Sequence, residues 1–273
     1  MDQVVFHGRG LHSGERCALT LSRAPGPFCF EHEDDQISRN ELELVRADRG
    51  VCLRAQGRGF EVDLVEHLFG ALAGLQVQSG ISVKVRGPEP PLLDGGALEL
   101  AAAIRALDPP RSPPRLRITR EETIELGESR YEFRPHPGIR IEVDAVFAEP
   151  FGSTRACWDG SATQFLREIA PARTFGWRNE GLSLRARGRA AHVDPDSVIV
   201  LEEDGSVLPP GRAPEPNELA RHKLLDLLGD TYFYGGPLLG SLFAYRPGHP
   251  RTHAALQEAL ARELLAPMPG PAA

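Results

Sequence analysis

Asp108-Pro-Pro-Arg-Ser-Pro-Pro-Arg115 is the stretch that divides this chain of 273 residues. Proline lacks a backbone N–H donor, so four prolines in eight residues exclude both a helix interior and a central strand. The flanking stretches are each long enough to bury a core of their own. The sequence therefore predicts an N-terminal domain over residues 1–107, a linker over 108–115, a C-terminal domain over 116–265 and a tail over 266–273.

Upstream of the linker, the spacing of apolar residues predicts both strands and helices. Alternating apolar residues predict strands over residues 17–22, 60–64 and 81–85. Residues 65–75 predict a helix, because its apolar side chains share one side: Val65, Leu68, Phe69 and Leu72. A second helix is expected over residues 97–107.

Downstream of the linker, the same reasoning gives another mixture of elements. Strands are expected over residues 116–124, 139–147 and 197–201. Helices are expected over residues 162–169, 218–228 and 254–265. Strands and helices do not alternate regularly in either half, which favours α+β domains over a doubly wound parallel sheet.

Composition and charge narrow the class of protein. A formal net charge of -7 argues against a nucleic-acid partner, because phosphate neutralisation needs a concentrated basic face. The N-terminus lacks the pattern of a secretory signal, and no apolar run approaches the ~18 residues of a membrane span. The four cysteines form no C-x-x-C pair, which predicts free thiols. We expect a monomeric, cytoplasmic protein without an integral membrane segment.

His222 and Asp226 are candidate metal ligands. They lie four residues apart on a predicted helix, which places both side chains on one face. An imidazole and a carboxylate so arranged can bind one zinc ion, although a surface His–Asp pair has the same spacing.

Glu66 and His67 begin the other predicted helix and offer a complementary pair. Adjacent helical residues point about 100° apart, so one can bind a metal while the other takes a proton from the attacking water. The alternative is an amphipathic helix with two polar residues on its wet side. Together with His222 and Asp226, His67 gives three ligands and an open catalytic site between the two halves.

Two further residues have chemistry suited to hydrolysis. His249 lies in Tyr-Arg-Pro-Gly-His-Pro, a turn-rich segment predicted to be a loop, from which an imidazole can act as an acid. Thr174 lies in Ala-Arg-Thr-Phe-Gly, and its hydroxyl can donate to an oxyanion. Without context, the commoner alternatives are an ordinary loop histidine for His249 and, for Thr174, a threonine whose hydroxyl satisfies a backbone group.

Six motifs in this order resemble those of the UDP-3-O-acyl-N-acetylglucosamine deacetylase family. The motifs are GRGLHSG (8–14), VEHLFGALAGL (65–75), PEPPLLDG (88–95), ARTFG (172–176), RHKLLDLLGD (221–230) and YRPGH (245–249). The resemblance implies two similar α+β domains with helices sandwiched between two sheets and a zinc site at the domain junction. It also implies hydrolysis of the substrate's N-acetyl group, the committed step of lipid A biosynthesis.

By the same resemblance, His67, His222 and Asp226 match the zinc ligands and Glu66 matches the general base. Iron(II) is an alternative metal, because imidazole and carboxylate ligands suit both ions.

The remaining motif residues match groups that contact or position the substrate. His249 matches a cationic histidine that stabilises the oxyanion or protonates the leaving amine, and Asp230 matches the carboxylate that orients it. Thr174 matches a hydroxyl that holds the scissile carbonyl. Lys223, one of only two lysines in the chain, matches a substrate-contacting lysine, and Phe175 matches a residue of the sugar pocket.

One segment departs from the family pattern. Residues 188–200 replace a Gly-Gly pair with His192 and Val193 and an apolar residue with Arg189, where the family builds a passage for the acyl chain. Further replacements are Arg9, Leu64 and Gly96. They leave two alternatives open: a paralogous zinc amidase for another N-acetylated sugar nucleotide, and a catalytically silent zinc-containing homologue that binds a sugar nucleotide or a partner protein.

Overall fold

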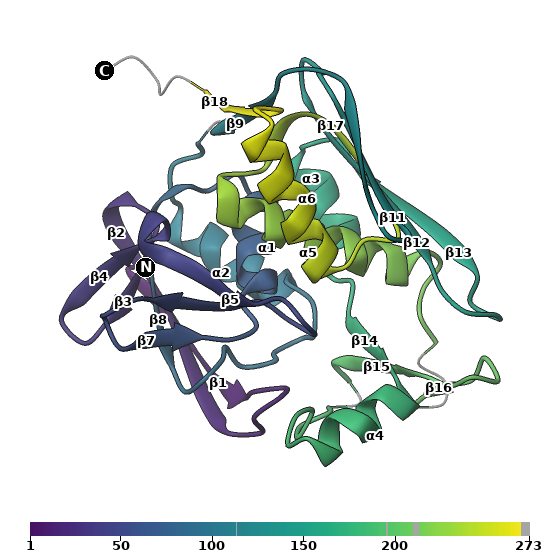
Figure 1. Cartoon of the computed structure of the whole chain (residues 1–273). Helices are drawn as coiled ribbons and strands as arrows, with labels where there is room; N and C mark the ends of the chain where they lie inside the picture. The colour runs from purple at the N-terminus through teal and green to yellow at the C-terminus, as the bar shows by residue number, and fades with distance from the viewer. Residues whose placement is uncertain (113, 195, 210–212, 269–273) are drawn as a thin grey trace.

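In the computed structural model, helices gather at the centre of the molecule with sheets on either side of them (Figure 1). The structure describes residues 1–112, 114–194, 196–209 and 213–268. The α+β class that the sequence predicts is confirmed. Within the described residues, no helix is both long and apolar enough to cross a membrane.

Two sheets are built from the first part of the chain. Among the described residues, the larger has five strands in the order β1-β2-β8-β3-β4, and the smaller has the order β5-β6-β7. Neighbouring strands are antiparallel except β3 and β8. The bounds are β1 Gln3–Arg9, β2 Arg16–Pro27, β3 Cys29–His32, β4 Asp35–Ser38, β5 Leu42–Arg46, β6 Cys52–Ala55, β7 Phe60–Val62 and β8 Ser79–Arg86.

The second part of the chain builds a large sheet and a small one. In the large sheet the order is β10-β11-β17-β12-β13, and β9 joins β17 to β18; in the small one it is β14-β15-β16. The bounds are β9 Leu116–Ile118, β10 Glu122–Leu126, β11 Ser129–Arg134, β12 Ile139–Val146, β13 Ser153–Trp158, β14 Thr174–Trp177, β15 Val198–Leu201, β16 Val207–Leu208, β17 Leu238–Tyr245 and β18 Leu265–Pro267.

The helices lie mostly between these sheets (Figure 1). They are α1 Glu66–Gly74, α2 Leu98–Leu107, α3 Ala162–Gln164, α4 Arg178–Ala186, α5 Glu218–Tyr234 and α6 His249–Ala261, with a 3-10 turn at Arg39–Glu41 and a π-helical turn at Phe165–Ile169. Helix α4 stands apart from the others, beside the small sheet β14-β15-β16 (Figure 1).

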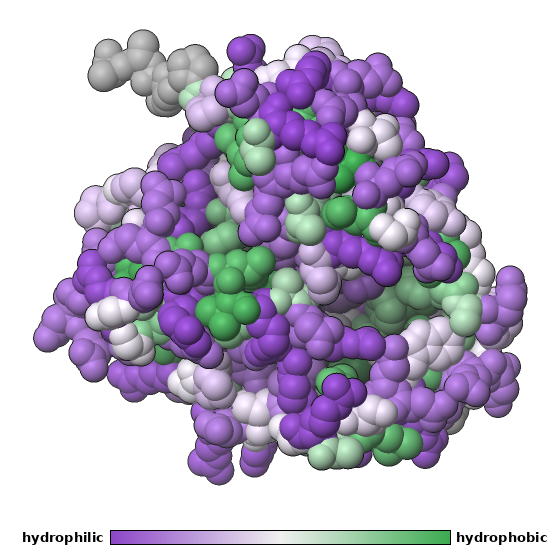
Figure 2. Space-filling view, viewed as in Figure 1, coloured by the Kyte–Doolittle hydropathy of each residue, from purple (hydrophilic) through white to green (hydrophobic). Residues whose placement is uncertain are grey.

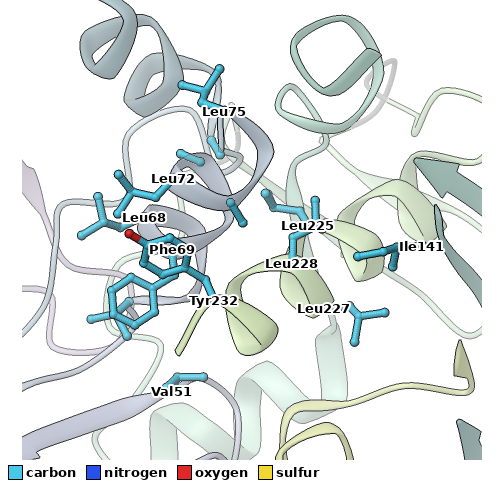
Figure 3. Close-up of a cluster of buried hydrophobic side chains, with 14 of the residues drawn as sticks. Val51, Leu68, Phe69, Leu72, Leu75, Ile141, Leu225, Leu227, Leu228 and Tyr232 are labelled. Atoms are coloured by element: carbon cyan, nitrogen blue, oxygen red, sulfur yellow. The ribbon is translucent and has the colours of Figure 1, made fainter. Parts of the chain in front are cut away.

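Helix α5 is the centre of the core. Figure 3 shows Leu225, Leu228 and Tyr232 on the side of α5 that faces α1, while Leu227 points the other way, towards Ile141 of β12. Because α5 is packed on opposite sides, it is apolar around most of its circumference rather than along one stripe. One continuous cluster of buried side chains thus includes residues from both halves of the chain.

Glycines let α1 and α5 approach each other closely. A Cβ atom on Gly229 would lie 2.1 Å from the carbonyl oxygen of Glu66, and one on Gly70 would lie 2.6 Å from Leu225 Cδ1. Only hydrogen fits at either position. The contact therefore fixes the separation of the two helices that carry Glu66, His67, His222 and Asp226.

Several element predictions need correction. Residues 116–124 form two strands with different partners, because β9 pairs with β17 and β18 whereas β10 pairs with β11. The last helix is α6, which begins five residues earlier than predicted and ends at Ala261, before β18. Residues 162–169 are helical, but their second part is a π-helical turn. Helix α5 extends six residues beyond the predicted end and stops at Gly235, whose φ of 115° suits glycine.

The predicted domain boundaries stay a prediction. Residue 113 of the predicted linker and residues 269–273 of the predicted tail lie outside the described residues. Two tail residues, Ala266 and Pro267, belong to β18.

Replacing Gly229 with alanine tests the close approach of the helices. We expect Gly229→Ala to lower the free energy of unfolding by about 1–3 kcal/mol, because the new methyl group overpacks the core against backbone. Urea unfolding followed by circular dichroism measures the loss. Gly181→Ala on α4 is the control, since a Cβ there meets nothing within 4 Å; equal stability of the two variants would contradict the prediction.

Candidate metal centre

His67, His222 and Asp226 meet where α1 passes α5. One ligand atom from each lies within 4.8 Å of the others. Asp226 Oδ1 is 3.7 Å from His67 Nε2 and 3.6 Å from His222 Nε2. The two imidazole rings stand nearly perpendicular, with their centroids 4.9 Å apart. Two imidazole nitrogens and one carboxylate oxygen converging on one point suit a divalent cation with an open coordination position.

Backbone contacts prepare His222 for this position. Its Nδ1 donates to the carbonyl oxygen of Ala172 at 3.0 Å, so the lone pair is on Nε2, which faces His67 and Asp226. Burial lowers the pKa of His222 to about 4, which keeps the ring neutral. A neutral imidazole with an available lone pair is the form that binds a metal.

Asp226 is a buried carboxylate whose charge is balanced by cations. Burial alone would raise its pKa, but Lys223, His222 and His249 outweigh burial and hold the pKa well below its usual range. Lys223 Nζ lies 2.9 Å from Asp226 Oδ2. Burial likewise opposes the charged form of His67, yet the contact with Asp226 raises the His67 pKa. The donor set therefore fits a cation: a carboxylate that stays ionised, flanked by two imidazoles.

Glu66 and His249 lie on the side of the cluster next to Asp226. Val51 N–H donates to Glu66 Oε2 at 3.0 Å, and Glu66 Oε1 is 3.9 Å from His249 Nε2. His249 Nδ1 donates to Asp230, 2.9 and 3.0 Å from the two carboxylate oxygens. Burial opposes protonation of His249, but Asp230 and Asp226 outweigh it and raise its pKa to about 10.

The prediction that His249 lies on a loop is wrong. His249 is the first residue of α6, and it is buried. Pro250 occupies the next position, where proline suits the first turn of a helix because its missing N–H would be unpaired there. The turn signals of residues 245–250 mark the start of a helix, which fixes the imidazole on a rigid element.

Thr174 and Phe175 begin β14 beside the same cluster. The Phe175 ring centroid is 5.6 Å from that of His222, and Lys223 Nζ lies 5.2 Å from the Phe175 centroid. Thr174 N–H donates to the carbonyl oxygen of Gly95 at 2.7 Å, and Thr174 lines the adjoining cavity. The structure thus gathers all nine site residues predicted from the sequence around one point.

A cavity of about 630 Å³ opens from this cluster towards α4. Apolar side chains of the segment between β14 and β16 line it, including Phe175, Trp177, Leu184, Val193, Val198, Val200 and Leu208. Others come from the first half of the chain, including Leu11, Leu64, Leu68, Leu92 and Leu100. The face seen in Figure 2 is mainly hydrophilic, and it is hollowed between the central helices and the segment that carries α4. The cavity is large enough for a drug-sized ligand. We call the apolar side chains that the β14–β16 segment contributes to it the apolar extension; charged residues also line this region, namely Asp48, Arg49, Arg178, Glu180 and Arg185.

The altered segment 188–200 leaves this cavity largely apolar. Among the described residues that line it, Val193 is present, while Arg189 and His192 are not. The Arg189 guanidinium instead donates to the carbonyl oxygens of Asp48 and Arg49, each at 3.3 Å. Two other replacements, Leu64 and Gly96, do line the cavity.

The side chains of His12 and Arg49 connect two segments that line the cavity. His12 Nε2 donates to Arg49 O at 2.8 Å, and Ala190 N–H donates to His12 Nδ1 at 3.3 Å. At the rim, Arg49 makes a bidentate pair with Glu180 of α4, with distances of 2.6 and 2.8 Å. These contacts join the loop before β6 to the segment around α4.

Several positioning groups have no distinctive sequence signal. The Ala172 carbonyl is a backbone atom, so its pairing with His222 is invisible in the side-chain pattern. Glu218 accepts from Arg173 N at 3.1 Å, Nε at 2.9 Å and Nη2 at 3.1 Å, which ties the residue before β14 to the start of α5. Only the folded structure brings these distant positions together.

The comparisons with known proteins agree with this arrangement. Residues 1–264 match the family model described as UDP-3-O-acyl N-acetylglycosamine deacetylase. A UDP-3-O-acyl-N-acetylglucosamine deacetylase of Pseudomonas entomophila is 33% identical over 266 residues, which cover 93% of this chain and 86% of the relative. Proteins of the same name are 33% identical in Shewanella sp. (strain W3-18-1), covering 96% and 87%, and 31% identical in Shewanella violacea, covering 97% and 88%.

Removing one ligand tests the metal centre. We expect His222→Ala to weaken zinc binding by more than about 100-fold, since even changes to groups behind a ligand typically cost 10–100-fold. Competition with a chromophoric chelator measures the affinity. His136→Ala is the matched control, because His136 is an exposed histidine whose ring hydrogen-bonds Gly138. Equal zinc affinity of both variants would exclude His222 as a ligand.

The Arg173–Glu218 pair predicts a pH-dependent stability. Burial would raise the pKa of Glu218, but hydrogen bonds from Arg173 and Glu215 N–H outweigh burial and lower it. The ionised carboxylate therefore stabilises the fold fully above its unfolded pKa of about 4.3, and this contribution is lost as pH falls through the lower folded pKa.

We expect Glu218→Gln to lower the free energy of unfolding at pH 7 by about 1.5–3 kcal/mol, the range for hydrogen bonds to charged groups. The difference from the parent protein should shrink as the pH is lowered towards 3. Urea unfolding at a series of pH values measures this difference. Glu121→Gln is the control, because Glu121 pairs with Arg134 at an exposed position. A difference that is constant with pH would contradict the assignment.

Proposed function

Because the chain belongs to the UDP-3-O-acyl N-acetylglycosamine deacetylase family, we propose that it hydrolyses the N-acetyl group of a UDP-3-O-acyl-N-acetylglucosamine. The products are acetate and the free glucosamine amine, in the committed step of lipid A biosynthesis. The observation that carries the proposal is the convergence of His67, His222 and Asp226 beside Glu66 and His249, at one end of an apolar cavity.

The proposed cofactor is one zinc ion held by His67, His222 and Asp226, and iron(II) suits the same ligands. When bound, such an ion supplies Lewis-acid chemistry: it makes water more acidic and polarises the amide carbonyl. The proposed location is the junction of two α+β domains, residues 1–107 and 116–265. The position of His67 on α1 and of His222 and Asp226 on α5 supports this assignment.

Glu66 is the proposed general base. Val51 N–H donates to its Oε2, so Oε1 lies on the side of His249 and of the three candidate metal ligands. From there the carboxylate can accept the proton of the attacking water. The fixed hydrogen bond to Val51 holds the carboxylate in one orientation, so little reorganisation accompanies proton transfer.

His249 is the proposed acid and electrostatic partner, and Asp230 is the proposed residue that orients it. With Nδ1 bound to Asp230, His249 directs Nε2 towards Glu66 Oε1 at 3.9 Å and Asp226 Oδ2 at 3.8 Å. An imidazolium at this point stabilises the negative charge that develops on the carbonyl oxygen and can protonate the leaving amine.

Thr174, Phe175 and Lys223 are the proposed substrate contacts. The Thr174 hydroxyl donates to the scissile carbonyl, and the Phe175 ring forms one wall of the sugar pocket. Lys223 contributes a positive charge for the anionic substrate, which its position between Asp226 and the Phe175 ring supports.

The apolar extension of the cavity supports an acylated substrate. Trp177, Leu184 and Val200 line it, and Arg189, which is not among the lining residues, donates to the carbonyl oxygens of Asp48 and Arg49. A saturated chain buried there gains about 0.8 kcal/mol per CH₂ group, which favours it over a substrate without the ester-linked chain. The proposal further includes a monomer in the cytoplasm, which the four unpaired cysteines support.

Acetate release by the zinc-loaded protein tests the proposed reaction. UDP-3-O-acyl-N-acetylglucosamine and unacylated UDP-N-acetylglucosamine are offered in parallel. We expect turnover of the acylated substrate only. Glu66→Gln should keep the metal and lose at least about 100-fold in kcat, the lower range for a general base.

Each other outcome has a distinct meaning. Equal or faster turnover of the unacylated sugar would identify a paralogous amidase that does not use the apolar extension. Turnover of neither compound, with one zinc bound, would reject the proposed substrate and favour a binding homologue. Loss of zinc from Glu66→Gln would overturn the division between ligand and base.

A further inference from the structure

A buried histidine that the proposed reaction does not use lies directly behind Asp230. His253 is on α6, one turn after His249, and it is 2% exposed. Its Nε2 lies 3.2 Å from Asp230 Oδ1, while His249 Nδ1 lies 2.9 Å from the same oxygen. One carboxylate, whose side chain is 1% exposed, therefore faces two imidazoles. A buried carboxylate gains from a second donor, because water does not reach it.

The contacts on the other side of His253 define which ring nitrogen holds the hydrogen. The Tyr234 hydroxyl lies 3.0 Å from His253 Nδ1 and also hydrogen-bonds the Gln257 side chain. A glutamine amide can donate to the phenol oxygen, which leaves the phenol hydrogen free to point to Nδ1. With Nδ1 as the acceptor, a neutral imidazole has its hydrogen on Nε2, the nitrogen next to Asp230.

The contact between His253 Nε2 and Asp230 Oδ1 is short but lacks good hydrogen-bond geometry. His253 Nε2 is buried and has no hydrogen-bond partner of good geometry among the described residues, although Asp230 Oδ1 is within reach. Buried N–H groups without an acceptor are rare, and each one needs an explanation. A small rotation of the Asp230 carboxylate would satisfy this donor while keeping Oδ2, 3.0 Å away, as the acceptor for His249.

We propose that His253, held by Tyr234, is a positioning residue that directs an Nε2–H donor at Asp230 and so fixes the carboxylate that orients His249. These side chains form a chain of successive contacts that leads from an exposed residue on α6 to the reacting end of the cavity. In order, its members are Gln257, Tyr234, His253, Asp230 and His249. His253 acts only through Asp230 and touches no substrate. The inference rests on the proposed function for its kinetic test, but not for its spectroscopic one.

A purely structural role for His253 makes different predictions. The His253 ring also packs against aromatic rings, with centroids 6.1 Å from Phe233 and 5.6 Å from Tyr234. If packing were its whole contribution, an apolar replacement would lower stability or leave it unchanged, without a selective effect on kcat.

The kinetic test compares His253→Leu with His253→Gln in acetate release from UDP-3-O-acyl-N-acetylglucosamine. We expect His253→Leu to lower kcat by about 10-fold or more with KM within about two-fold, as for other groups that orient a reacting residue. His253→Gln should recover most of the rate, because the glutamine amide places an N–H near the position of Nε2. Tyr234→Phe should show a smaller loss.

Thr252→Val is the matched control for buried polar groups on α6. Thr252 is 1% exposed and hydrogen-bonds the Tyr131 hydroxyl at 3.0 Å. It should lose stability, measured by thermal unfolding, with kcat unchanged. A kcat for His253→Leu equal to that of the parent protein, or a loss that His253→Gln does not recover, would overturn the proposal.

The spectroscopic test does not depend on activity. Nitrogen-15 NMR of the histidine rings should show His253 with its hydrogen on Nε2, and Tyr234→Phe should weaken this preference. A hydrogen on Nδ1 would overturn the proposal even if the enzyme is active. Conversely, a parent protein that releases no acetate but shows the Nε2–H form would reject the proposed function and leave the positioning of Asp230 intact.

Discussion

The close contact between α1 and α5 is the constraint on which the rest of the structure depends. Gly229 and Gly70 let the backbones approach until only a hydrogen atom fits between them. At that separation, the first turn of α1 delivers Glu66 and His67 to the face of α5 that carries His222 and Asp226. Metal ligands tolerate displacements of only a few tenths of an ångström. A side chain at either glycine would therefore disturb the site and the core together.

Because the contact is buried, the charges it brings together need partners. Asp226 is accompanied by Lys223 and three histidines, and Asp230 by His249 and His253. An isolated carboxylate at such a depth would take up a proton, since desolvation disfavours its charged form. Lys223 and the His249 imidazolium keep Asp226 ionised, and His249 does the same for Asp230. A metal ligand and an orienting acceptor both require the ionised form. The charged state of this polar cluster thus depends on the presence of all its members as much as on the helices that hold them.

Sequence patterns predicted the parts of this arrangement that local spacing determines. The i, i+4 relation of His222 and Asp226 follows from helical geometry. The helix predicted over residues 65–75 is α1, but the side of α1 in closest contact with α5 carries Gly70, while Leu68 and Leu72 point away from α5 (Figure 3). The start of α6 was missed, because a Gly-His-Pro sequence is typical of loops and of helix N-termini alike. His253 and the Ala172 carbonyl were missed because their partners lie at other places in the chain, and only tertiary structure shows such pairs. The break within residues 116–124 is of the same kind, since the pairing partners of β9 and β10 differ.

The chemical groups and the apolar extension of the cavity come from different structural elements. Most of the groups assigned to catalysis and metal binding are on α1, α5 and α6, inside the core, where a change in volume affects overall stability. The apolar extension is formed mainly by the segment from β14 to β16, which packs around its own small cluster of Ile199, Leu201 and Leu219. Substitutions such as Arg189, His192 and Val193 can accumulate there without moving a ligand, because Arg189 finds acceptors in the neighbouring loop. This separation explains how a chain can keep every residue expected for hydrolysis while the segment from β14 to β16 diverges.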